Sequence, residues 1–521
     1  MCAAVLTIGV KTTSDLEWPS DQDLFRDIAQ AQTIADGSFS ADPFYLDEKV
    51  WHNPLIPSVV AGSSKALTLS VHTTFVRLGP YLNLLGPLAF FVWVSRFAGV
   101  LGAATATFGF VFFKERWAPE WVTAAYSPWL FAMTSSQVFL YSGLVAYRTA
   151  LVGKEMSSYV LAGVLLGLTF LAAAPPALLL GGTVLIGCFW KTITEGRANQ
   201  SPGARRVLLW HSVLVAVALA VASPFLYWIL VHYQLRVLNR VPMKWEWAGM
   251  KTVLTSFDLA WPKVLAVVGA LTVYWRRRER YTDAVLLGSI AVVATVLLGY
   301  RWAFARLGLA LPQFVPSHYF IFYWQALKWQ FVGVAVERLW ELLPKGFIAR
   351  TAGAPLRLAS LVATVGVAGG LAFVVGPYAA RGYFTGARDE SLAEGARPHL
   401  AKAFAWIRAN TSPVDVFLAS PEAALRLVGP AGRKAVVVGS VFSNPYVDWA
   451  ERARASELMW GALRTGNAAD FWRMARAFHV TFVLVSRVSQ PWLREEDTPP
   501  DIPGIRAVFR AGGLAIWSVN R

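Results

Sequence analysis

The chain has 521 residues, of which 55% are hydrophobic and only 15% are charged. That balance excludes an ordinary soluble globular protein, in which about 25% of residues are charged. The 48 Lys and Arg exceed the 32 Asp and Glu by 16 charges, an excess that membrane topology explains better than a nucleic-acid partner does, because connectors on the inner side of a membrane are rich in Lys and Arg.

Ten stretches are apolar enough to be membrane-spanning helices, each near the roughly 20 residues that a bilayer core requires. They are 72–95, 97–113, 127–147, 158–174, 176–190, 207–231, 262–275, 284–300, 318–337 and 358–377. The opening MCAAVLTIGV is apolar but too short to cross. It predicts the end of an eleventh span, a surface anchor or a signal remnant. We therefore expect a polytopic α-helical membrane protein with 10 or 11 spans.

The distribution of Lys and Arg predicts the orientation of these spans. Basic residues are denser in alternate connectors, as in the run Arg276, Arg277, Arg278 and Arg280. Such connectors lie on the cytoplasmic side. This places a first loop, 12–71, and the tail, 378–521, on the extracytoplasmic side of the plasma (inner) membrane. The spans and the first loop make up a predicted membrane domain, 1–377.

The tail changes in character from the apolar spans. Short apolar runs, DVFLAS, KAVVVGS, VTFVLVSR and LAIWSVNR, alternate with helical segments such as DWAERARASELMWGAL. This pattern predicts a small α/β domain over 378–521 that ends in a hairpin through Gly512 and Gly513.

The first loop opens with an acid-rich helix. Ser20 and Asp23 have the spacing of a capping box, which predicts a helix from there to about Ala35. Asp21 then shares a face with Phe25 and Ile28, the face that packs, whereas Asp23 lies on the solvated face. Acids at a helix N-terminus also offset the backbone dipole. That role accounts well for Asp23 and less well for Asp21, which would point into the apolar body and need a partner.

A polar pair follows at the predicted membrane surface. The segment SADPFYLDEKVWHNPLIPSVVAG contains Pro43, Pro54 and Pro57, which predict a broken interfacial helix. His52 and Asn53 lie beside aromatic residues suited to the headgroup region. His52 is either an interfacial side chain, half in water, or a functional group.

These first-loop patterns resemble the GT-C superfamily of membrane glycosyltransferases. The resemblance rests on D-x-x-x-F-x-x-I-A, on DG-x-F-x-x-DPFY and on NPLIP before the second span. The chain is similar to the protein mannosyltransferases and the lipid A aminoarabinose transferases. That similarity implies a GT-C fold and transfer of a sugar from a polyprenyl phosphate on the outer side of the membrane. The tail has no WWDYG sequence, which an oligosaccharyltransferase would carry.

The resemblance also implies roles for particular residues. The family's first-loop acid falls on Asp21, and its basic residue in K-P-P-L falls on His52, where this chain reads His-Asn-Pro-Leu. A second acid, expected near the fourth span, is replaced here by Ser135, Ser136 and Gln137. Either Glu115 or Glu120 takes that place, or the site works with one carboxylate.

The implied chemistry explains these residue types. The acceptor hydroxyl must lose a proton as it attacks the anomeric carbon, so Asp21 is the candidate general base. Cationic donors would stabilise the departing phosphate. Besides His52, the candidates are Arg301, His318 and Lys328. Arg301 could instead be a snorkelling anchor and His318 a helix cap, whereas Lys328 is a cation deep in a predicted span, where charge is costly and marks function.

We find no metal-binding sequence motif and no Gly-rich phosphate loop, which favours a lipid-linked donor over a nucleotide sugar. No cofactor is expected, although a divalent cation shared by Asp21 and phosphate stays an alternative. The expected partners are a polyprenyl-phosphate sugar, a glycan, lipid or protein acceptor, and membrane lipids. The leading function is an inverting glycosyltransferase. The alternatives are a flippase of lipid-linked sugars, which would show repeated halves, and a non-catalytic assembly factor.

Overall fold

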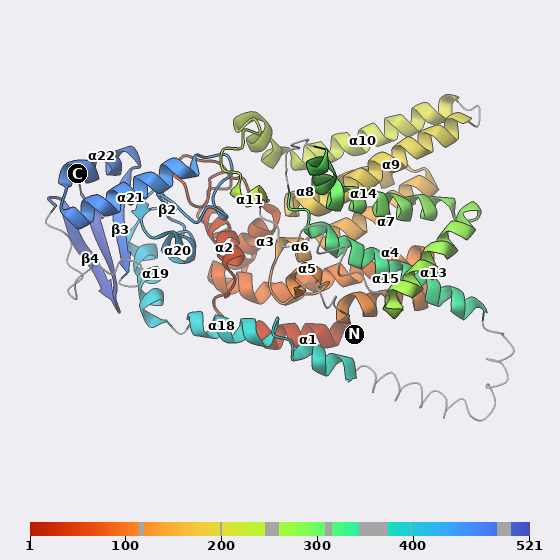
Figure 1. The fold of residues 1–521 in the computed structure, drawn as a ribbon, viewed down its shortest axis with the longest axis horizontal. Helices are drawn as coiled ribbons and strands as arrows, with labels where there is room; N and C mark the ends of the chain where they lie inside the picture. Colours follow the sequence, from red (N-terminus) through yellow and green to blue (C-terminus); the bar gives the residue numbers. More distant parts are fainter. Residues whose placement is uncertain are drawn as a thin grey trace. The chain divides into compact units, whose positions relative to one another are not determined.

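The computed structural model describes residues 1–113, 119–197, 201–244, 260–307, 315–342, 373–395, 397–486 and 502–520. Figure 1 shows a mostly helical chain with one sheet near its C-terminus. The chain divides into two compact units, which we call the membrane unit and the loop–tail unit. The membrane unit comprises 1–12, 79–223 and 246–386, and the loop–tail unit comprises 13–78, 224–245 and 387–521.

The membrane unit is built from long apolar helices. Four helices in the described ranges are long and apolar enough to cross a membrane. The bounds of the longer helices are α1 Cys2–Thr13, α4 Val71–Phe112, α7 Gln137–Gly153, α8 Met156–Ala172, α9 Ala174–Arg197, α10 Ser201–Leu226, α13 Trp261–Trp275, α14 Tyr281–Arg306 and α15 Tyr319–Leu342. Its shorter helical elements are α5 Glu120–Thr123, α6 Ala132–Ser135 and η2 Arg276–Arg278.

Aromatic side chains fill the core of the membrane unit. Trp93, Tyr141, Tyr323 and Trp329 are among its largest fully buried residues. Large apolar side chains also lie on its outside, among them Leu185, which is 71% exposed. Apolar patches of this extent are unusual on soluble monomers, and lipid tails would cover them.

Nine of the predicted spans overlap helices in the described ranges, although 127–147 starts ten residues before α7 begins at Gln137. The stretches 72–95 and 97–113 both fall within α4, which is interrupted at Gly99 with φ 68° and ψ −177°. Only glycine adopts that conformation readily, so the break divides α4 where the sequence predicts two spans. The tenth predicted span, 358–377, lies outside the described residues except for its last five.

The loop–tail unit contains a five-stranded sheet with the order β2-β1-β3-β5-β4. Its strands are β1 Val416–Leu418, β2 Lys434–Ala435, β3 Val480–Ser486, β4 Ile505–Ala511 and β5 Leu514–Val519. β1 pairs in parallel with both β2 and β3, whereas β5 is antiparallel to β3 and β4. The predicted hairpin is confirmed: Gly512 and Gly513, both with positive φ, connect β4 to β5.

Successive strand residues point to opposite faces of the sheet. Helices cover both of these faces. On one side, Val483, Val485 and Trp517 pack with Met459 and Phe471. The latter two belong to α21 Trp449–Thr465 and α22 Ala468–Ala477.

The second face of the sheet is covered by the first loop together with part of the tail. Phe417, Leu484 and Ile516 pack with Ile407 of α19 and with Phe25 of the first loop. The elements of this layer are α2 Gln22–Ala35, α19 Pro398–Asn410, α20 Pro421–Ala423 and η3 Ala424–Val428. The remaining helical elements of the loop–tail unit are α3 Leu55–Leu67, η1 Tyr227–His232, α11 Val241–Lys244 and α18 Thr385–Gly395, which begins in the membrane unit.

Polar contacts also join the first loop to the tail. Asp42 is fully buried and accepts hydrogen bonds from the backbone N–H groups of Phe44 (2.7 Å) and Tyr45 (2.9 Å) and from Asn444 Nδ2 (2.9 Å). Lys434 Nζ donates to the backbone carbonyl of Asp42. Residues 13–78 and 387–521 therefore share one folded unit, and the predicted domain boundary at 377/378 stays a prediction.

The prediction of a polytopic α-helical membrane protein with a C-terminal α/β domain is confirmed. The predicted broken interfacial helix is wrong, because α3 is continuous from Leu55 to Leu67. It begins directly after Pro54, so Pro57 lies in the first turn, where its missing N–H costs no hydrogen bond.

Candidate active site

Asp21 lies at the N-terminus of α2 and is its N-cap residue. Its backbone is extended (φ −73°, ψ 133°), and its carboxylate accepts a hydrogen bond of 2.8 Å from the backbone N–H of Asp23. The sequence predicts this role for Ser20, one residue earlier. Instead, Ser20 Oγ donates to the carbonyl of Ala387 at 3.4 Å. The start of the helix thus fixes the position of the Asp21 carboxylate.

The Asp21 side chain is exposed, so the expectation that it points into the apolar body is wrong. Phe25, Ile28 and Gln32, which share its face, are buried as predicted. The first turn extends past the edge of that packed face, which leaves the carboxylate accessible to water.

Protein atoms around Asp21 nevertheless displace much of the bulk water, and this desolvation raises the pKa of Asp21 to about 6. Repulsion from the Asp23 carboxylate adds to the increase, and the hydrogen bond from the Asp23 N–H offsets part of it. At neutral pH the carboxylate is mostly ionised and is a stronger base than an ordinary aspartate.

Arg26 connects the next two acids. Its Nη1 lies 3.2 Å from Asp23 Oδ1, and its Nε donates to Asp27 Oδ1 at 2.9 Å. The Asp23 side chain is 49% exposed, which agrees with the predicted solvated face, but the Asp27 side chain is only 6% exposed. Burial raises the pKa of Asp27, and Arg26 offsets part of that increase.

His52, in the segment before α3, lies next to this charged group. Its Nδ1 lies 3.6 Å from Asp27 Oδ1, and its backbone carbonyl accepts a hydrogen bond of 3.1 Å from Gln30 Nε2. Burial lowers the pKa of His52 well below its usual range, and Arg26 acts in the same direction. The ring is therefore neutral at pH 7, and it can donate one N–H but does not carry the charge of the lysine it replaces.

Three buried polar atoms, one of His52 and two of its neighbours, make no hydrogen bond within the described part of the chain. They are Gln30 Oε1, Trp51 Nε1 and His52 Nδ1. Asn53 follows and is half-buried. Buried polar groups are nearly always hydrogen-bonded in folded proteins, so these atoms mark a place that can accept a polar ligand or water.

Glu120 lies in the membrane unit. Its Oε1 is 3.5 Å from Arg381 Nε, and its side chain is 13% exposed. It is the first residue of α5, so it also suits the positive end of the helix dipole. Glu115 lies outside the described residues. The identity of a second catalytic acid stays a prediction.

The remaining predicted cations also lie in the membrane unit. His318 is buried directly before α15, and its carbonyl accepts the N–H of Ile321 at 3.1 Å. Lys328 is half-buried within α15, with Nζ 5.0 Å from the ring centroid of Trp329. Arg301 lies in the last turns of α14, where only the backbone is described. Their roles at a lipid phosphate stay predictions.

Sequence reasoning did not select Arg26 or Asp27 as site residues. One signal could have found Arg26, because it is the only basic residue between Thr12 and Glu48. A lone base among many acids has ion-pair partners within reach of the same helix. Asp27 gave no such signal, because its burial depends on how the segment around His52 packs on α2.

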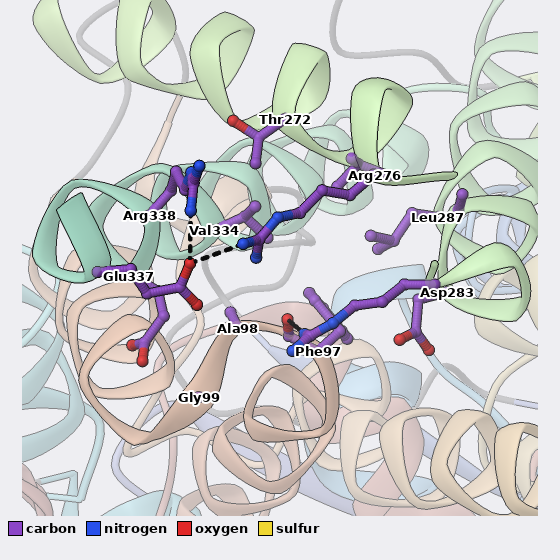
Figure 2. Close-up of a pocket in the computed structure, with 14 residues that line it drawn as sticks. Phe97, Ala98, Gly99, Thr272, Arg276, Asp283, Leu287, Val334, Glu337 and Arg338 are labelled. Carbon is purple, nitrogen blue, oxygen red and sulfur yellow. Dashed lines mark hydrogen bonds and ion pairs between the residues drawn. The ribbon is translucent and has the colours of Figure 1, made fainter. Parts of the chain in front are cut away.

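A separate cavity of about 90 Å³ lies within the membrane unit and is shown in Figure 2. The Arg276 and Arg338 side chains both reach the Glu341 carboxylate, at 2.9 and 3.0 Å. Glu337 Oε2 accepts the N–H of Gly102 at 2.9 Å, just after the break in α4. These charges neutralise one another, and the cavity contains none of the residues predicted from the sequence. We interpret it as structural.

No cluster of three His, Cys, Asp or Glu side chains suited to a metal ion occurs in the ranges that the structure describes. Asp21 and Asp23 supply two neighbouring carboxylates, but Asp23 already pairs with Arg26. A divalent cation between Asp21 and phosphate stays an alternative.

Neither protein-family models nor curated protein sequences match this chain. Solved structures do match it. ArnT from Cupriavidus metallidurans, in its apo form and bound to undecaprenyl phosphate, aligns with a TM-score of 0.54 at 15% identity, over 99% of this chain and 96% of ArnT. An oligosaccharyltransferase from Archaeoglobus fulgidus, tethered to an acceptor peptide, aligns with a TM-score of 0.52 at 12% identity, over 93% of this chain and 68% of that enzyme.

Both matched proteins are members of the GT-C superfamily. At these identities the likeness concerns the fold, and it extends over nearly the whole chain. The resemblance predicted from the first loop is thereby confirmed: the protein has the fold of the GT-C membrane glycosyltransferases.

Proposed function

We propose that the protein is a membrane glycosyltransferase. It transfers a sugar from a polyprenyl-phosphate-linked donor to an acceptor hydroxyl on the extracytoplasmic side of the membrane, with inversion at the anomeric carbon. The observation that carries the proposal is the water-accessible Asp21 carboxylate at the N-terminus of α2, with its pKa raised to about 6. The GT-C fold supports it, since one protein of this fold was solved bound to undecaprenyl phosphate.

In the proposed reaction, the Asp21 carboxylate takes the proton of the acceptor hydroxyl. The acceptor oxygen forms a bond to the anomeric carbon, and the bond from that carbon to the phosphate oxygen breaks. The polyprenyl phosphate leaves with the electron pair. Attack opposite the leaving group inverts the anomeric centre, and by analogy with glycoside hydrolysis the transition state resembles an oxocarbenium ion.

The neighbouring groups have distinct tasks in this proposal. Negative charge grows on the departing phosphate and needs donors in fixed positions. His52 supplies a neutral N–H, and Arg26 supplies a guanidinium, whose position is fixed by Asp23 and Asp27. Arg301, His318 and Lys328 stay further candidates for the phosphate.

The test compares Asp21→Asn with the wild type in release of polyprenyl phosphate from a set of lipid-linked sugars. Asparagine is as good an N-cap as aspartate, so α2 keeps its start and only the base is lost. We expect turnover to fall about 10²- to 10⁴-fold. A thermal unfolding temperature of the variant no lower than that of the wild type would show that the loss is chemical.

A matched control is Asp47→Asn. Asp47 is an exposed acid of the same loop with φ 63°, a conformation that asparagine tolerates. We expect unchanged turnover in this variant. Unchanged turnover in Asp21→Asn would remove Asp21 from the mechanism, and no turnover by the wild type with any donor would favour the flippase or the assembly factor.

A further inference from the structure

The strand order of the loop–tail unit defines a place where a ligand can bind. From β1 the chain passes to β2 on one side, and then crosses to β3 on the other side of β1. Helices of the two connections lie on opposite faces, η3 on one and α21 on the other. In open α/β sheets, ligands bind outside the carboxyl ends of the strands at such a reversal.

A cavity of about 170 Å³ occurs at this point. Ser420, two residues after the end of β1, and Ser486, the last residue of β3, both line it. The N-terminal turns of α19 form another wall through His399 and Leu400. The cavity therefore lies at the carboxyl edge of β1 and β3, within a single folded unit.

Aromatic rings from the first loop and from α19 form the apolar wall. Trp18 and Phe25 are stacked with ring centroids 5.8 Å apart, and Phe404 meets the edge of Trp18 at 5.1 Å. All three line the cavity. Phe25 lies one helical turn after Asp21, on the same face of α2, so this wall continues along α2 from the proposed general base.

Paired charges form the polar wall. Glu394 lies 3.2 Å from Arg426 and 3.3 Å from Arg397, and Glu422 lies 3.4 Å from Arg426 Nε. Two guanidinium groups and two carboxylates give no net charge. Arg426 Nε is buried, and it makes the ion pair with Glu422 without a well-formed hydrogen bond.

An apolar wall next to a charge-balanced set of donors and acceptors suits a ligand with both apolar C–H surfaces and many hydroxyl groups. An anion would compete with Glu394 and Glu422 for the same arginines, and its desolvation would not be repaid. A neutral sugar ring meets both walls without that cost.

We infer that this cavity binds a neutral sugar unit of the acceptor, and so holds the acceptor along α2 toward Asp21. That the bound sugar belongs to the acceptor rests on the proposed function. Binding of a sugar in the cavity can be measured without any transfer reaction.

The experiment uses the full chain, purified in a detergent without a sugar headgroup. The probes are methyl glycosides of mannose, glucose, galactose and N-acetylglucosamine, with inorganic phosphate as the anionic probe. Saturation-transfer NMR reports which glycoside binds, and line broadening of the ³¹P signal reports phosphate. We expect binding of at least one glycoside and none of phosphate.

Ala401→Trp blocks the cavity, because Ala401 is exposed on α19 and lines it. The matched control is Ala409→Trp, the same change at an exposed position two turns further along α19 and outside the cavity. We expect Ala401→Trp to raise the glycoside Kd at least about tenfold and Ala409→Trp to leave it unchanged. In the transfer assay, Ala401→Trp should raise KM for the acceptor while kcat stays within about twofold.

Each outcome separates the inference from the function on which it rests. Glycoside binding that Ala401→Trp does not weaken, binding of phosphate alone, or no binding of any probe would overturn the inference. In those cases Asp21-dependent turnover would still support the glycosyltransferase. Cavity-dependent glycoside binding in a protein without turnover would keep the sugar site and refute the proposed reaction.

Discussion

Asp21 and Asp42 are two carboxylates of the same first loop in opposite environments. Asp21 is exposed, and its carboxylate accepts a hydrogen bond from the backbone N–H of Asp23 at the start of α2. Asp42 is fully buried, accepts three hydrogen bonds and lies near the ammonium group of Lys434. Burial raises the pKa of Asp42 too, but these partners offset part of the increase.

Stability and chemistry depend on different acids of the same loop. The carboxylate oxygens of Asp42 accept hydrogen bonds from the loop backbone and from Asn444 of the tail, so Asp42 holds the loop on the tail. Asp21 is accessible to water and has a raised pKa. The raised pKa costs stability at neutral pH, and both properties suit a general base. Asp42, whose carboxylate makes the more hydrogen bonds, is thus less suited to catalysis than Asp21.

The largest expected effect on stability comes from Asp42→Ala. This change removes the acceptor for two backbone N–H groups and for Asn444, and it leaves the buried Lys434 without its opposite charge. We expect a loss of about 3–5 kcal/mol in the free energy of unfolding. Chemical denaturation in detergent measures it. Asp389→Ala, at an exposed position of α18, is the control and should change stability by less than about 0.5 kcal/mol.

The pH dependence of turnover should show the raised pKa of Asp21. Because the base must be ionised, kcat/KM should rise with pH through about 6 and be roughly tenfold lower at pH 5 than at pH 7. His52 is already neutral in this range, so we expect no loss of activity between pH 6 and 8. A profile that is flat from pH 5 to 7 would contradict a base with this pKa.

The smallest expected effect is a gain in stability from Asp21→Asn. A carboxyl whose pKa is raised by folding binds its proton more tightly in the folded state, so the wild type loses stability as pH rises from about 4 to about 6. Removing the charge should therefore stabilise the variant at pH 7, by less than about 1 kcal/mol because water screens an exposed group. Thermal unfolding at pH 7 and below pH 4 should show that the difference disappears in acid.

Much of the fold could be predicted because its signals are local. Apolar runs of sufficient length marked the spans, and Gly512 and Gly513 between two apolar runs marked the hairpin. The break at Gly99 also lies within three residues of the predicted start of the second span at residue 97. Periodicity placed Phe25 and Ile28 on the buried face of α2.

The parts that could not be predicted depend on contacts between distant segments. The exposure of Asp21 depends on where the packed layer ends, which helical periodicity does not reveal. The burial of Asp27 depends on His52, 25 residues later, and that of Asp42 on Asn444. The candidate sugar cavity combines Trp18 with Ser420 and Ser486, and no sequence pattern connects those three positions.

The joining of the first loop to the tail has a consequence for biosynthesis. Tyr45 and Ser443, whose hydroxyl groups lie 2.8 Å apart, are separated by 398 residues. At roughly 5–20 residues per second, the ribosome makes the second residue about 20–80 s after the first. Throughout that interval the aromatic residues of the nascent loop lack the sheet that later covers them, so this layer of the loop–tail unit cannot complete its folding until the end of the chain has been made.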